Sequence, residues 1–246
     1  MTMLAYSLLG LAVGSFLNLC IDRLPEGRSI ISPSSHCEAC GHRLAPFDLV
    51  PVLSYLLLRG RCRYCATRIP LRILAVECGT GLLFALLWHL YDDPLQLALA
   101  TLYILFLMVL LVVDLERHRI LNRLVYPGLA FALLSAPLVP HHYLLELLGG
   151  GLVGFGLLFL IALAYPGGMG MGDVKLAALI GLMVGFPEIL VALFLSFVAG
   201  GIAAVSLMLA GLKGRRDPIP FGPFLAMGGM VSMLYGETIL TWTARL

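Results

Sequence analysis

The chain has 246 residues, of which 60% are hydrophobic and 12% are charged, with a mean hydropathy of +0.98 and a formal net charge of +2. Soluble domains carry a charge on about a quarter of their residues. The composition therefore excludes a soluble enzyme or binding module and predicts an all-α polytopic membrane protein.

Apolar runs long enough to cross a hydrocarbon layer of about 30 Å follow one another along the chain. The first run has arginines after it and no basic residue before it, which is the reverse of a secretory signal, so we expect a retained helix. A shorter run begins just after a glycine-rich stretch, and counting it gives about eight transmembrane helices. The expected spans are 3–21, 71–90, 95–113, 120–139, 144–165, 176–187, 189–212 and 224–243.

The basic residues test this count. Every Lys and Arg except Arg245 lies in, or directly beside, the loops that eight spans place on one side of the membrane. By the positive-inside rule these loops are cytoplasmic and both termini lie outside. The connections on the other side, 91–94, 140–143 and 186–188, hold no Lys or Arg. The basic loops are 22–70, 114–119, 166–175 and 213–223.

The polar segment 22–70 contains two Cys-x-x-Cys pairs, "CEAC" and "CRYC". This pattern is typical of a zinc ribbon, in which two turns supply a tetrahedral shell of four sulfurs. Two disulfides are the alternative, but a cytoplasmic loop keeps its thiols reduced. His36 and His42 flank the first pair as competing ligands. We predict a small zinc-ribbon-like loop domain whose structural Zn²⁺ is bound by Cys37, Cys40, Cys62 and Cys65.

Three acids fall at membrane depth, where ionisable groups are costly and are candidates for function: Glu77, Asp114 and Asp173. With eight spans, both aspartates lie at the cytoplasmic edge. Two carboxylates that share a proton can hydrolyse a peptide bond, one acting as general base on water and the other donating to the carbonyl. Each aspartate alone could instead be a helix cap, and the three acids together could line an ion path.

The glycines in "GMGMGDVK" leave room for a substrate backbone beside Asp173, because Gly170 and Gly172 carry no Cβ. Lys175 either balances charge near the aspartates or extends to the membrane interface.

These motifs occur in a characteristic order: "GSFLNLCIDRLP", the two cysteine pairs, "VVDLERHRILNRLVYPG", "GMGMGDVKLAA" and "PFGPFLAMGG". In this order they resemble the type IV prepilin peptidases, bifunctional leader peptidases and N-methyltransferases of the GxGD aspartic protease group. Members commonly have Ile-Pro-Asp or Ile-Pro-Asn after the first aspartate, whereas this chain has Ile120, Leu121 and Asn122.

The resemblance implies that Asp114 and Asp173 are catalytic, that Gly170, Gly172 and Lys175 complete the motif, and that the four cysteines bind the metal. It implies prepilin or pseudopilin substrates, cleavage at the cytoplasmic face of a bacterial inner membrane, and N-methylation from S-adenosylmethionine. We expect the protein to lie in the lipid bilayer, and we expect that it does not bind nucleic acid. The expected domains are a first helix at 1–21, a loop domain linked to methyl transfer at 22–70, and a peptidase domain at 71–246.

Two points stay open at this stage. The residues alone do not show a methyl-donor site, although Arg72 and Glu77 are candidates for holding the donor or the substrate amine, with helix packing as the alternative. A peptidase without methyl transfer and a membrane protein with an ion path remain alternatives. Glu116 is a candidate for an electrostatic contact with the basic leader peptide of a substrate.

Overall fold

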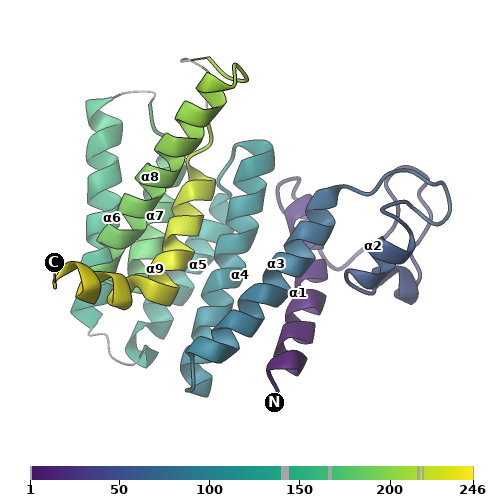
Figure 1. Cartoon of the computed structure of the whole chain (residues 1–246), viewed down its shortest axis with the longest axis horizontal. Coiled ribbons are helices and arrows are strands. Elements are labelled where there is room, and N and C mark those ends of the chain that lie inside the picture. The colour runs from purple at the N-terminus through teal and green to yellow at the C-terminus, as the bar shows by residue number, and fades with distance from the viewer. Residues whose placement is uncertain (1, 140–143, 166–167, 215–216, 218, 246) are drawn as a thin grey trace. The chain divides into compact units, whose positions relative to one another are not determined.

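The computed structural model describes residues 2–139, 144–165, 168–214, 217 and 219–245, and in these ranges the regular elements are all helices (Figure 1). The predicted connection 140–143 and the arginines at 215 and 216 lie outside the described residues. The chain forms two compact units, Met1–Leu97 and Ala98–Leu246, with the boundary in the first turn of α4.

Unit 1 consists of two long helices and the loop between them: α1 (Met3–Arg23), η1 (Pro46–Leu49), α2 (Leu53–Leu57) and α3 (Leu71–Leu90). Helices α1 and α3 approach closely because small residues face the contact. A Cβ added to Gly14 would lie 2.8 Å from the Cα of Glu77. Two hydrogen bonds to α3 carbonyls also tie α1 to α3, from Ser7 to Gly81 (3.1 Å) and from Asn18 to Ile73 (3.1 Å).

Unit 2 is a helical bundle built around α7. Its elements are α4 (Pro94–Arg117), α5 (Asn122–Ser135), η2 (Ala136–Leu138), α6 (Leu144–Ala164), α7 (Met171–Val184), α8 (Glu188–Leu209) and α9 (Gly222–Thr243). Helix α7 contacts α5, α6, α8 and α9, and it is almost wholly buried after its first turn. A Cβ on Gly181 would collide with the backbone of Gly150, so α6 and α7 can pack only with glycine at this crossing.

Within the described residues, six helices are long and apolar enough to cross a membrane: α1, α3, α4, α6, α8 and α9. The predicted spans at 120–139 and 176–187 correspond to α5 and α7, which have 14 residues each. At 1.5 Å per residue, each is about 21 Å long, which is shorter than the hydrocarbon layer. The eight-span topology therefore stays a prediction, and six spans are supported by helix length and composition.

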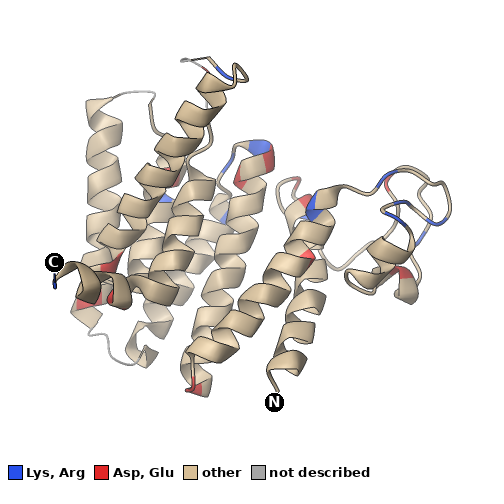
Figure 2. Ribbon diagram, in the orientation of Figure 1, with Lys and Arg blue, Asp and Glu red and all other residues tan. Residues whose placement is uncertain are grey.

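Charge in unit 2 follows the ends of the helices (Figure 2). Arg117 is in the last turn of α4, Arg123 lies in the first turn of α5, and Lys175 lies near the start of α7. Glu146 and Glu188 lie in the first turns of α6 and α8, at the end of the bundle away from these basic residues. Helix α7 therefore begins among the basic residues, which is where its aspartate lies.

Candidate active site and metal site

The loop between α1 and α3 brings four cysteines together. Their Sγ atoms all lie within 4.8 Å of one another, and all four are free thiols. Four sulfur donors at this separation fit the tetrahedral shell of a metal such as zinc. The cluster predicted from the spacing is therefore present and can hold a metal ion; it comprises Cys37, Cys40, Cys62 and Cys65.

Each cysteine pair lies in the same kind of backbone turn. The N–H of the first cysteine donates to the carbonyl five residues later, Cys37 to His42 (2.9 Å) and Cys62 to Thr67 (2.8 Å). The residue after each second cysteine has a positive φ, 70° in one turn and 57° in the other. An isolated bridge closes each turn, over residues 36–43 and 61–68. The shared pattern Cys-x-x-Cys, a small residue, any residue, Arg is visible in the sequence and marks this repetition.

The thiols differ in their tendency to ionise. Hydrogen bonds with the side chain and backbone of Thr67 lower the pKa of Cys65 to about 6. For Cys40, a backbone hydrogen bond from His42 lowers the pKa, but desolvation and hydrogen bonds with Cys65 and Cys37 raise it to about 11. The ring of His42 stacks on Tyr64 at a centroid separation of 3.6 Å, so this side chain has a partner outside the four-sulfur cluster.

The two predicted aspartates line one cavity in unit 2. Asp114 lies near the end of α4 and is 5% exposed, and Asp173 lies in the first turn of α7. The cavity has a volume of about 710 Å³. The backbone at Gly222 lies against the carboxylate of Asp114, and the backbone at Gly170 lies beside that of Asp173. Residues far apart in the sequence thus present two carboxylates to the same space.

Glycines and one isoleucine form the wall beside these carboxylates. A Cβ on Gly222, the first residue of α9, would lie 2.5 Å from Oδ2 of Asp114 and 3.2 Å from Ile120. A Cβ on Gly172 would lie 2.9 Å from the Cβ of Ile120, and one on Gly170 would lie 3.3 Å from Oδ2 of Asp173. Both motif glycines line the cavity, and the backbone approaches the carboxylates because they carry no side chain.

Lys175 points to helix α5. Its Nζ donates to Oδ1 of Asn122 (3.2 Å) and to the hydroxyl of Tyr126 (3.0 Å), and it lies 5.1 Å from the centre of the Tyr126 ring. This lysine thus ties the start of α7 to the start of α5.

Three features of the cavity were not foreseen from the sequence. His118 lines it and has a φ of 51°, and Gly222 supports Asp114 from the start of α9. One wall is aromatic, formed by Phe197, Phe221 and Phe224. His118 lies one helical turn after Asp114, which is a signal that the sequence did contain.

The remaining candidates lie in unit 1. Glu77 is 4% exposed, and its Oε2 accepts a hydrogen bond from the N–H of Val52 at 2.7 Å. Arg72 forms an ion pair with Asp22 on α1 at 2.8 Å.

Each of the two units contains a segment that matches a known protein domain or family. Residues 8–91 match the Bacterial Peptidase A24 N-terminal domain, and residues 101–205 match the Type IV leader peptidase family. The second match includes both aspartates of the cavity. No solved structure matches this chain.

Proteins described as "Prepilin leader peptidase/N-methyltransferase" are similar along almost the whole chain. The protein of Bacillus subtilis (strain 168) is 35% identical over 96% of this chain and 96% of its own length. That of Pseudomonas putida is 32% identical over 98% of this chain and 93% of its own. That of Pseudomonas aeruginosa PAO1 is 32% identical over 94% and 90%. The fold and the site define a class of protein: it has apolar helices long enough to span a membrane, a four-cysteine loop, and two aspartates in one cavity. The chain belongs to the type IV leader peptidase family.

Proposed function

We propose that this protein cleaves the leader peptide from prepilins and pseudopilins and then methylates the new N-terminal amine. It is an endopeptidase with N-methyltransferase activity. Relatives that carry both activities in their names match this chain over at least 94% of its length. The observation that supports the peptidase chemistry is the shared cavity of Asp114 and Asp173.

The two aspartates divide the chemistry of hydrolysis. The ionised carboxylate takes a proton from a water molecule, whose oxygen attacks the scissile carbonyl, and the protonated carboxyl donates to the carbonyl oxygen. When the tetrahedral intermediate collapses, the C–N bond breaks and the leaving nitrogen takes a proton from the site. The close approach of the backbone at Gly222 and Gly170 restricts the positions of the carboxylates during these transfers.

The rest of the cavity suits a peptide substrate. Gly170 and Gly172 leave space for an extended backbone beside Asp173. The aromatic wall of Phe197, Phe221 and Phe224 can pack against an apolar side chain at the cleavage site.

The four-cysteine cluster holds a structural Zn²⁺ in this proposal. The loop 22–70 is too small to build a core of its own, so a closed metal site would supply its folding energy. S-adenosylmethionine supplies an electrophilic methyl group when it is bound. The loop domain serves the methyl transfer, and the helices of 71–246 carry the peptidase.

The proposed topology has eight spans, with both termini outside and the aspartates at the cytoplasmic face of the bacterial inner membrane. The distribution of Lys and Arg supports this orientation. The short helices α5 and α7 would cross as packed members of the bundle, since α7 is surrounded by four other helices.

The test is cleavage of a purified prepilin by wild-type protein, Asp114→Asn and Asp173→Asn, with mass spectrometry reporting leader loss and methylation separately. Each substitution should lower the cleavage rate by at least about a thousandfold, because neither carboxylate can replace the other. Glu237→Gln is the matched control, since it changes an exposed acid on α9. Cleavage at a normal rate by either aspartate variant, folded and with its zinc, would show that the dyad is wrong.

A further inference from the structure

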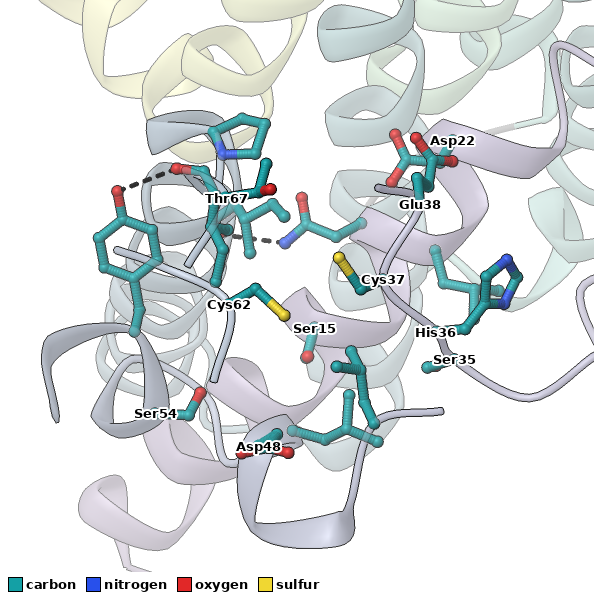
Figure 3. Close-up of a pocket in the computed structure, with 18 of the residues that line it drawn as sticks. Ser15, Asp22, Ser35, His36, Cys37, Glu38, Asp48, Ser54, Cys62 and Thr67 are labelled. Carbon is teal, nitrogen blue, oxygen red and sulfur yellow. Dashed lines mark hydrogen bonds between the residues drawn. The ribbon is translucent and has the colours of Figure 1, made fainter. Parts of the chain in front are cut away.

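Unit 1 contains a cavity of about 470 Å³ of its own (Figure 3). The last turns of α1, the cysteine loop and the first turns of α3 enclose it. Its volume is in the range of sites that bind small molecules, about 300 to 1,000 Å³. Cys37 and Cys62 of the four-sulfur cluster line one side of it.

Asn18 lines this cavity, and its side chain contains a buried hydrogen-bond acceptor without a partner among the described residues. The residue is 5% exposed, and its Nδ2 donates to the carbonyl of Ile73 at 3.1 Å. A carbonyl can only accept a hydrogen bond, so this bond identifies the donating amide atom as Nδ2 and the other amide atom as the acceptor Oδ1. Oδ1 is buried and has no partner among the described residues. Because a buried acceptor without a donor is costly, Asn18 indicates a ligand with an N–H or O–H group.

Glu77 adds a buried carboxyl group. Three other acids line the cavity, and each of them pairs with an arginine: Asp22 with Arg72, Glu38 with Arg28 and Asp48 with Arg63. Glu77 is 4% exposed and forms no ion pair within the described part of the chain; one backbone N–H, that of Val52, binds its carboxylate. A positively charged ligand would supply the counter-charge that this buried carboxyl group lacks.

We propose that this cavity is the binding site for S-adenosylmethionine, with Oδ1 of Asn18 accepting an N–H of the donor and Glu77 facing its positive charge. The assignment rests on the proposed methyl transfer. The ligand carries a sulfonium and an ammonium group, which would supply the cation that Glu77 lacks. Its amino groups are hydrogen-bond donors, which would supply the donor that Oδ1 of Asn18 lacks. Each half of the site comes from a different helix, and the close contact at Gly14 holds the two helices together.

The assignment is tested by the equilibrium binding of radiolabelled S-adenosylmethionine to the full chain in nanodiscs, without any pilin. Asn18→Leu removes the acceptor, and Glu77→Gln removes the charge while keeping an oxygen for the N–H of Val52, so the second variant preserves the fold. Ser7→Ala is the matched control: it also removes a hydrogen bond from α1 to an α3 carbonyl, but it lies outside the cavity.

Asn18→Leu and Glu77→Gln should each raise the Kd for the donor about tenfold or more, and Ser7→Ala should change it less than about twofold. Prepilin cleavage should stay near the wild-type rate in all three. Unchanged donor affinity in both cavity variants would overturn the proposed site. This holds even if methylation falls in these variants, because the cavity would then bind the substrate amine instead of the donor. Wild-type protein that neither binds the donor nor methylates a cleaved pilin would overturn the methyl transfer itself, and the site with it.

Discussion

The carboxylate of Asp114 lies directly against the backbone of Gly222, although the two residues belong to helices α4 and α9. A Cβ at position 222 would lie 2.5 Å from Oδ2 and 3.0 Å from Cγ of Asp114. Only glycine allows this contact, so the orientation of one proposed catalytic group depends on the first residue of the last helix.

Gly222→Ala should therefore lower cleavage by at least about tenfold, because the added methyl displaces the carboxylate and a shift of about 1 Å is enough for such a loss. The measurement is the cleavage rate of a purified prepilin. Gly156→Ala on α6 is the control, since a Cβ there meets nothing within 4 Å. Equal rates for wild type and Gly222→Ala would mean that Asp114 does not act from this position.

Lys175→Met should weaken the bundle by about 1 kcal/mol and leave most of the cleavage activity, because Nζ binds Asn122 and Tyr126 of α5. Asn122→Ala should have a similar effect, and the double variant should be less destabilised than the sum of the two. The measurement is unfolding in mixed micelles. A shifted pH optimum of cleavage in Lys175→Met, with none in Asn122→Ala, would instead identify the lysine as a charge partner of the aspartates.

Leu121→Pro should stabilise the protein by about 0.5 to 1 kcal/mol. Leu121 precedes α5 with φ −77° and ψ 112°, a φ that proline also adopts, and its N–H donates to no partner among the described residues. Leu124→Pro is the contrasting variant, because the N–H of Leu124 donates to the carbonyl of Leu121 at 2.9 Å. Thermal unfolding checks both, and a lower melting temperature for Leu121→Pro would contradict the reading of this turn.

Removal of zinc should abolish methylation and leave cleavage within about threefold of its starting rate, since two of the four cysteines line the cavity in unit 1 and the aspartates lie in unit 2. The experiment treats the protein with a chelator and measures bound metal, cleavage and methylation on the same sample. Cys62→Ser should behave like the chelated wild type, whereas Cys78→Ser, outside the cluster, should keep its zinc. Loss of cleavage on chelation would contradict the separation of the two activities.

Asp48 should stabilise the loop in a pH-dependent way. Desolvation raises its pKa, but the hydrogen bonds and charge of Arg63, 2.7 Å away, together with the N–H of Ala45, lower it overall. Since the folded-state pKa is depressed, the contribution is present above the unfolded value of about 3.9 and is lost as the pH falls through the folded value.

Asp48→Asn should therefore lower the stability of the loop by about 1 kcal/mol at neutral pH. The difference from wild type should shrink once the pH falls below about 3.9 and vanish only below the depressed folded-state pKa. The measurement is unfolding of both proteins at each pH, so that the loss of zinc in acid acts equally on both. A difference that persists at the lowest pH would mean that the ion pair is not its source.

Much of the chain could be predicted because its signals are local. The apolar runs, the two cysteine turns and the placement of Asp173 in the first turn of a helix depend on residues within a few positions of one another. In the part of the chain that the structure describes, these predictions are confirmed for six long apolar helices and for the four-sulfur cluster. Helix α7 begins at Met171, five residues before the expected run, because the residues around Asp173 are themselves helical.

The sequence by itself thus determined the membrane class, the cysteine cluster and the identity of the two aspartates as candidates. Only the tertiary structure decided that Asp114 and Asp173 line one cavity, that Gly222 supports the first, and that Lys175 binds α5. It also placed Asn18 beside the same cavity as Glu77. The physical reason is that helix neighbours are chosen by close packing at small residues such as Gly14 and Gly181, and that choice is made between segments far apart in the chain.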